Sequence, residues 1–137
     1  MLRTQILAFT GAFLITACFA VLWHVALFEQ HFLSLGVFTR MDAPLYHFGF
    51  IAWVLEAGAL VLTFFRTNWR QASMLDALKV AWLLGVFSAA SALFGMAAKV
   101  RIDDLTLWFL LTGGFIFLHT TLLGLWLGYL SAKARQA

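Results

Sequence analysis

Two ionisable side chains lie deep inside apolar stretches of this sequence, and they are its clearest chemical signal. Glu56 lies near the middle of the apolar run at residues 45–65, and His119 lies near the middle of another at residues 105–131. An ionised acid near the centre of a bilayer costs several kcal/mol unless it is paired, hydrated or protonated. We therefore expect Glu56 to have a partner, and an imidazole on a neighbouring helix can be that partner.

Helix geometry places the two groups at a similar depth. At a rise of about 1.5 Å per residue, Glu56 lies about 17 Å and His119 about 21 Å from the helix ends on the external side of the membrane. The hydroxyls of Ser88, Ser91 and Thr16 come to a similar level, which predicts a polar cluster near the membrane midplane. The Glu56–His119 pair would hold either opposite charges or a shared proton. It would serve as a site for a proton, ion or small molecule, or as an interhelical contact that fixes helix register.

The same residue types could form a catalytic triad, with Ser88 or Ser91 as the nucleophile beside His119 and Glu56. The sequence contains no nucleophile-elbow motif around either serine. We therefore expect the protein not to be an enzyme.

A second group of potential ligands lies around the loop between the first and second apolar runs. It comprises His24, His31, His47 and Glu29. Imidazole and carboxylate groups bind Cu, Zn or Fe, and a haem held between His24 and His47 is a narrower form of the same hypothesis. The spacings match no established metal motif, so the expected cofactor is none.

Four apolar segments must position these groups. They span residues 4–28, 45–65, 74–98 and 105–131, each close to the roughly 20 residues that cross the hydrocarbon core. The chain is 64% hydrophobic and 11% charged, whereas a soluble domain carries about 25% charged residues. A spanning segment must satisfy its own backbone hydrogen bonds, so each segment is expected to be a helix. Short connections make neighbouring helices antiparallel. We predict a single domain over residues 1–137. Its fold class is all-α, an antiparallel four-helix transmembrane bundle with the lipid bilayer as its partner.

The N-terminal run also has features of a targeting segment. Arg3 followed by apolar residues resembles a signal peptide, and the sequence before Cys18 resembles a lipoprotein cleavage site. The residues after Cys18 continue the apolar run, so we expect a retained first helix. A single cysteine excludes an internal disulfide.

The distribution of basic residues predicts the orientation of the helices. Six lie on one side of the predicted bundle and three on the other: Arg3, Arg66, Arg70, Lys79, Lys133 and Arg135 against Arg40, Lys99 and Arg101. Basic residues favour the cytoplasmic side, so both termini are expected there, in a cell inner membrane. The charge is spread rather than clustered, which argues against a nucleic-acid partner.

Rows of small and polar residues predict which helix faces pack together. The rows are Ala8, Ala12, Thr16, Ala20 and His24; Gly49, Ala52, Glu56, Ala59 and Thr63; Ala81, Gly85, Ser88, Ala92, Gly95 and Lys99; and Thr120, Gly124 and Gly128. The Gly124–Gly128 pair could instead join two copies of the chain in a homo-oligomer.

The loop at residues 29–44 contains apolar residues at helical spacing. Phe28, Phe32, Leu35 and Phe38 predict a short interfacial helix, with Gly36 and Pro44 as the residues that would bound it. A loop anchored by aromatic side chains has the same composition.

One local pattern resembles a known group of proteins. The sequence VLWHVALF at residues 21–28 is followed by a loop with Arg40 and Pro44 and then by a glycine-bearing second helix. This pattern, which covers the first half of the chain, resembles small bacterial four-helix integral membrane proteins of unknown function, whose first helix ends in Trp-(His or Tyr)-x-x-Leu-Phe. The resemblance implies a bacterial inner-membrane protein and carries no activity with it.

Three functional hypotheses therefore remain open. The first is binding or transport of a proton, ion or small molecule through the Glu56–His119 cluster. The second is a non-catalytic accessory subunit of a larger membrane complex. The third is a metal- or haem-binding membrane protein.

Overall fold

The computed structural model describes residues 2–37 and 43–136, and these residues form helices joined by turns and short connections. Phe38, Arg40 and Asp42 lie outside the described residues. The helices in chain order are α1 (Leu2–Val21), the π-helical segment η1 (Leu22–Leu27), α2 (Glu29–Ser34), α3 (Tyr46–Arg66), α4 (Met74–Ser88), the π-helical segment η2 (Ala89–Gly95), α5 (Met96–Lys99) and α6 (Leu105–Gln136).

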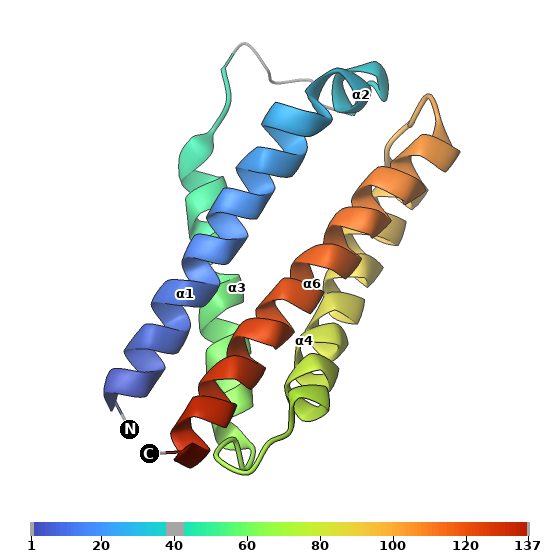
Figure 1. The fold of residues 1–137 in the computed structure, drawn as a ribbon. Coiled ribbons are helices and arrows are strands. Elements are labelled where there is room, and N and C mark those ends of the chain that lie inside the picture. The colour runs from blue at the N-terminus through green and yellow to red at the C-terminus, as the bar shows by residue number, and fades with distance from the viewer. Residues whose placement is uncertain (1, 38–42, 137) are drawn as a thin grey trace.

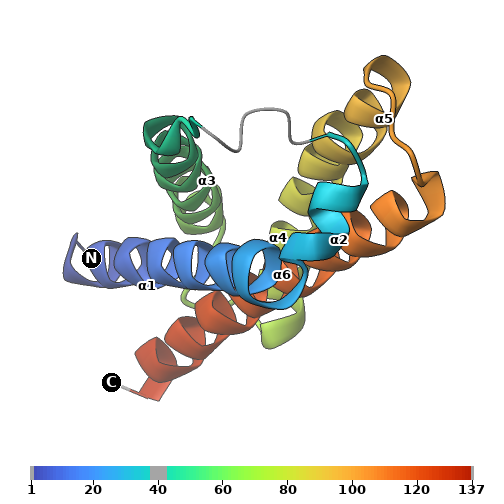
Figure 2. The same cartoon turned by 90° about the horizontal axis from the view of Figure 1, so that it is seen from above.

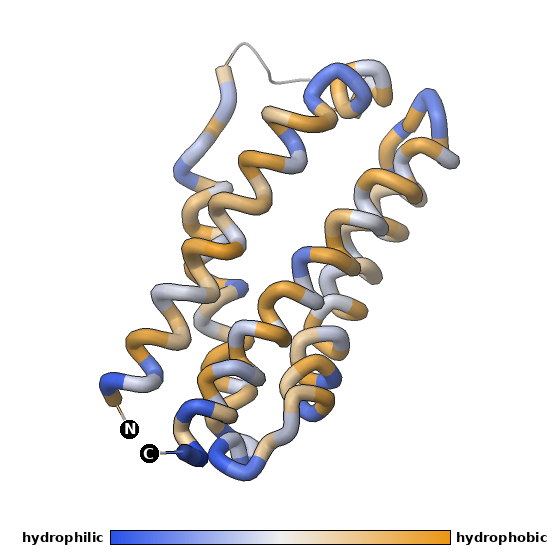
Figure 3. The backbone as a smooth tube through the Cα atoms, viewed as in Figure 1, coloured by the Kyte–Doolittle hydropathy of each residue, from blue (hydrophilic) through white to orange (hydrophobic). Residues whose placement is uncertain are grey.

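Four continuous helical stretches are long and apolar enough to cross a membrane. They are Leu2–Leu27, Tyr46–Arg66, Met74–Lys99 and Leu105–Gln136, so the prediction of an all-helical chain with four long apolar helices is confirmed. The start of α1, the end of α6 and the α3–α4 connection lie at one end of the molecule, which we call the terminal end (Figure 1). The other end, formed by α2 and the α5–α6 connection, we call the distal end. Hydrophilic residues gather mainly at these two ends (Figure 3).

Close packing between α4 and α6 depends on glycines. A Cβ atom added at Gly124 would lie 2.9 Å from the Cα atom of Leu78, and one added at Gly85 would lie 2.7 Å from Cγ2 of Thr120. Gly128 approaches Met74 in the same way, at 3.2 Å from its Cα atom. Because α4 covers the Gly124–Gly128 face inside the chain, that face does not remain open for a second copy.

The packing face of α1 follows the predicted row. Ala8, Ala12, Thr16 and Ala20 are all buried, although steps of four residues drift around an ideal helix. Small side chains let the backbones of neighbouring helices approach closely.

The packing face of α3 differs from the prediction. Its buried residues are Ala57, Leu60, Val61, Phe64 and Phe65, whereas the predicted row of Gly49, Ala52, Glu56, Ala59 and Thr63 is exposed or only half-buried. The physical reason is complementarity: large side chains of α3 fill the space beside small alanines of α1. The small residues of α3 are left to line a cavity, described below.

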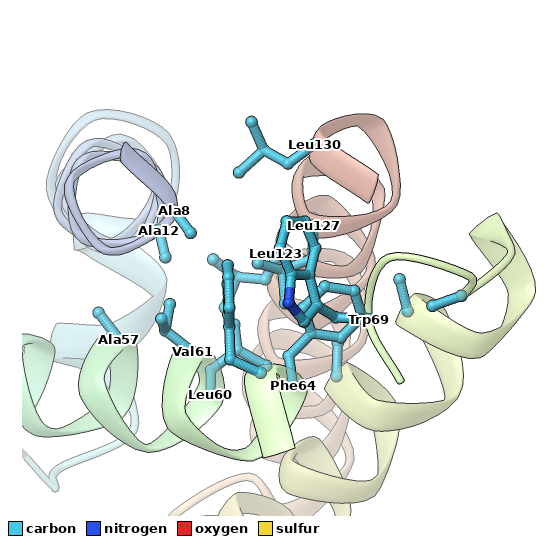
Figure 4. Close-up of a cluster of buried hydrophobic side chains, with 14 residues drawn as sticks. Ala8, Ala12, Ala57, Leu60, Val61, Phe64, Trp69, Leu123, Leu127 and Leu130 are labelled. Atoms are coloured by element: carbon cyan, nitrogen blue, oxygen red, sulfur yellow. The ribbon is translucent and has the colours of Figure 1, made fainter. Parts of the chain in front are cut away.

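The terminal end of the molecule is closed by a hydrophobic core. Side chains from α1, α3, α6 and the α3–α4 connection converge there (Figure 4), including Ala8, Leu60, Phe64, Trp69 and Leu127. The Ser131 hydroxyl lies 2.7 Å from the carbonyl oxygens of both Trp69 and Ala72, which ties the connection to α6. The capping box formed by Ser73 and Asp76 then starts α4.

The distal end carries the short helix that the loop spacing predicted. In α2, Phe32 is buried, and Leu35 just after the helix is fully buried. Both belong to a second apolar cluster with Leu93, Trp108 and Leu111, so this side of the segment packs on the other helices rather than lying free in an interface. Gly36 follows with a φ of 71°, a conformation that glycine adopts without a steric penalty.

Candidate functional site

Glu56 and His119 face each other between α3 and α6. His119 Nδ1 lies 3.6 Å from Glu56 Oε1, within ion-pair range, and the His119 side chain is only 3% exposed. This distance is longer than a hydrogen bond, and a side-chain movement of about 0.6 Å would form one. The Glu56 side chain keeps 35% of its surface exposed, so one side of the pair is enclosed and the other is open.

Thr16 of α1 completes the cluster from the opposite side of the imidazole. His119 Nε2 lies 3.0 Å from Thr16 Oγ1, and Thr16 is 1% exposed. A threonine hydroxyl can either donate or accept a hydrogen bond, so it satisfies Nε2 in either protonation state. Three helices therefore meet at one imidazole.

The Glu56–His119 pair can take up one proton, and the protonated pair then carries no net charge. When Glu56 is ionised and His119 is neutral, Nδ1–H points to the carboxylate and the Thr16 hydroxyl donates to Nε2. An added proton leaves either a neutral acid facing Nδ1 or an imidazolium facing a carboxylate, with Nε2–H donating to Thr16 in both cases. The cluster thus has the chemistry of a proton acceptor and donor.

Aromatic rings fix the plane of the imidazole. Phe115 stacks on His119 with ring centroids 5.2 Å apart, and Phe19 lies parallel at 6.1 Å. Phe115 is one helical turn before His119, so its contact could have been found from the sequence spacing. The contact with Phe19 depends on the packing of α1 against α6 and has no local signal.

The open side of Glu56 faces a cavity of about 640 Å³, which we call the inner cavity. Its wall combines the small-residue face of α3, the side of α4 that bears Ser88, and the side of α6 that bears His119. The two views of the fold show α3 set apart from α4, α5 and α6 at the distal end (Figure 2). No Lys or Arg lies on the described wall, and apart from Glu56, two histidines, a serine and two threonines the wall is apolar.

A second cavity of about 670 Å³ lies nearer the distal end, and we call it the outer cavity. Glu29, Tyr46 and Trp53 contribute to its wall, while His24 and Phe32 line both cavities. The His24 and Phe32 rings lie 4.7 Å apart and form part of the partition between the two spaces. His24 Nδ1 is 3.0 Å from the Ala20 carbonyl oxygen; since a carbonyl only accepts, Nδ1 carries a proton.

The proposed metal ligands are not brought together. Among the described residues, which include His24, His31, His47 and Glu29, no three His, Cys, Asp or Glu side chains are grouped in a way that could hold a metal ion. The imidazoles contact aromatic rings instead: His31 contacts Phe28 and His47 contacts Phe48. This geometry does not support the four-residue metal site.

The structure places Thr16, rather than Ser88 or Ser91, at the position of the nucleophile in the predicted triad. The order Thr16 Oγ1, His119 Nε2, His119 Nδ1 and Glu56 Oε1 matches the connectivity of a nucleophile, base and acid. Thr16, however, is almost completely buried and does not line the inner cavity, so a substrate in that cavity has no access to its hydroxyl. The geometry therefore offers no catalytic nucleophile at this position.

The predicted serines have different positions. Ser88 lines the inner cavity, but Ser91 is exposed and its hydroxyl donates to the carbonyls of Phe87 and Ser88. Ser91 lies in η2, where the wider π-helical turn changes which residues share a face.

Thr112 is a cavity residue that the sequence reasoning missed. It lines the inner cavity, and its buried hydroxyl oxygen has no hydrogen-bond partner in the part of the chain that the structure describes. Its position seven residues before His119, about two helical turns, is the signal that could have found it.

Comparisons of the chain with protein-family models, with curated proteins and with solved structures find no significant match. The resemblance of residues 21–28 to small bacterial membrane proteins therefore stays a prediction.

Proposed function

We propose that the chain is a bacterial inner-membrane protein that moves protons across the bilayer in connection with solute binding in the inner cavity. Its bundle would be antiparallel and transmembrane, with both termini on the cytoplasmic side. Four candidate spans support this proposal, as do the large apolar side chains on the outside, such as Leu62, Leu83 and Leu110, which are more than half exposed. Surfaces of this kind suit lipid contact. The six-to-three bias of basic residues supports the orientation.

The observation that carries the functional proposal is the position of the Glu56–His119 pair in the wall of the inner cavity. A contact needed only for helix register can be enclosed on all sides, as the Thr16–His119 contact is. Glu56 instead keeps about a third of its surface open to the cavity. Ionisable groups that face a cavity inside a membrane commonly belong to proton and substrate pathways.

Proton movement in phosphatidylcholine vesicles tests this function. Vesicles containing the purified protein and a trapped pH indicator receive an inside-negative potential from a potassium gradient with valinomycin. We expect the wild-type interior to acidify faster than that of empty vesicles. We expect Glu56→Gln to abolish the difference, because the amide keeps the side-chain shape and loses the titratable group.

The control is Asp103→Asn, which also replaces a carboxylate by an amide, at an exposed position that lines neither the inner nor the outer cavity. It should keep the wild-type rate. Equal rates for wild-type protein, Glu56→Gln and empty vesicles would contradict the proposal. That outcome, combined with stable co-purification with a larger complex, would favour an accessory subunit.

A further inference from the structure

We propose that the inner cavity binds a lipophilic organic cation whose charge lies beside Glu56. This inference rests on the proposed function and specifies the class of solute. The cation would be one whose charge is spread over, or shielded by, apolar groups, such as a phosphonium or quaternary ammonium compound.

The size and shape of the inner cavity suit such a molecule. Its volume of about 640 Å³ lies within the usual range of small-molecule sites, about 300–1,000 Å³. Its wall follows α4 and the segments after it from Ala81 to Met96, a length of about 22 Å at 1.5 Å per residue. A molecule with several rings or a short alkyl chain fits this space, and the apolar wall replaces water around its apolar groups.

The charge of the wall favours a cation over an anion or a neutral molecule. Within residues 2–37 and 43–136, Glu56 is the only carboxylate on the wall, and no Lys or Arg accompanies it there. The other titratable groups that face the cavity are His119 from α6 and His24 from η1. An anion would meet the carboxylate without a fixed opposite charge to balance it, whereas an organic cation neutralises it inside the low-dielectric space.

Aromatic side chains add a second attraction. Phe87, Trp108 and Phe115 all line the inner cavity. The face of an aromatic ring attracts a cation by about 0.5–2 kcal/mol, and quaternary ammonium groups are common ligands of such surroundings.

The ligand set argues against a small metal cation as the solute. Calcium takes about six to eight oxygen ligands, and magnesium requires near-octahedral coordination. The described wall offers one carboxylate, while His119 Nε2 already contacts Thr16. A lipophilic cation carries little bound water, so one carboxylate and an apolar wall are enough for it.

Binding of tetraphenylphosphonium to the purified protein in detergent micelles tests this inference. We expect saturable binding that weakens about tenfold or more in Glu56→Gln, a loss equivalent to about 1.4 kcal/mol. Binding should also weaken at acidic pH, because a proton on Glu56 competes with the cation. Tetraphenylborate has nearly the same shape and the opposite charge, so it should not bind when it is tested alone.

Two control variants keep the test independent of folding. Asp103→Asn, at a carboxylate that lines neither cavity, should bind like the wild type, and Glu56→Asp should retain part of the binding because it retains the charge. Equal affinity of wild type and Glu56→Gln, or equal binding of the borate, would overturn the inference.

The two proposals can fail separately. If Glu56-dependent proton movement occurs in vesicles but tetraphenylphosphonium does not bind, only the class of solute is wrong. If the phosphonium binds through Glu56 but no proton moves, the cavity assignment holds and the transport proposal is wrong.

Discussion

Substituting Gly124 by alanine should loosen the contact between α4 and α6. The new Cβ atom would lie 2.9 Å from the Cα atom of Leu78 and 3.3 Å from Cβ of Ala81. The first of these contacts is with backbone, which cannot rotate away as a side chain does. Reaching an ordinary contact distance requires the helices to separate locally by about 0.5 Å, and overpacking of this kind typically costs about 1–3 kcal/mol. Alanine is the better helix former by about 1 kcal/mol, so we expect a net loss of about 1 kcal/mol in the free energy of unfolding.

Gly49→Ala provides the matched control for this prediction. Gly49 lies in α3, and an added Cβ atom would meet nothing within 4 Å, so this variant should be as stable as the wild type or slightly more stable. Both variants would be unfolded reversibly in mixed micelles by increasing the fraction of dodecyl sulfate, with circular dichroism reporting helix content. A Gly124→Ala variant as stable as Gly49→Ala would refute the close α4–α6 packing on which the position of His119 depends.

Three further predictions concern the site and the topology. Thr16→Val removes the partner of His119 Nε2 and should cost about 1 kcal/mol of stability in the same unfolding assay. The double variant Thr16→Val, His119→Leu should lose less stability than the sum of the losses in the two single variants. Strictly additive losses would argue against the contact. His24→Ala removes part of the partition between the two cavities, so proton movement in the vesicle assay should become faster, and a slower rate would contradict that role. A periplasm-active reporter fused to the C-terminus should be silent, and moving Arg66 and Arg70 to the opposite side should raise its signal; a strong signal from the unchanged protein would reverse the topology.

The helices and the depth of the polar groups could be predicted from the sequence because both depend on position along the chain. Apolar run length sets where each helix begins and ends, and the rise per residue brings Glu56 and His119 to one level. The contact between Thr16 and His119 also agrees with the predicted level of their hydroxyl and imidazole groups.

The rotation of each helix about its own axis was harder to predict. A row of small residues such as Ala52 and Ala59 can either pack against a helix or line a cavity, and the sequence pattern is the same in both cases. In α3 the large residues, including Leu60 and Phe64, form the buried face. The π-helical turn of η2 likewise moves Ser91 away from the predicted cluster, and no residue in that segment signals the wider turn.

Chemical labelling of Glu56 tests the central claim of a carboxyl group that is open to an apolar cavity. A hydrophobic carbodiimide such as dicyclohexylcarbodiimide reacts with protonated carboxyl groups in apolar surroundings, and mass spectrometry of the digested protein locates the modified residue. We predict modification at Glu56 and not at Asp103, whose side chain is 60% exposed beside Arg101. The same treatment should leave Glu56→Gln unmodified. An intact, folded protein in which Glu56 remains unlabelled from mildly acidic to neutral pH would contradict the account.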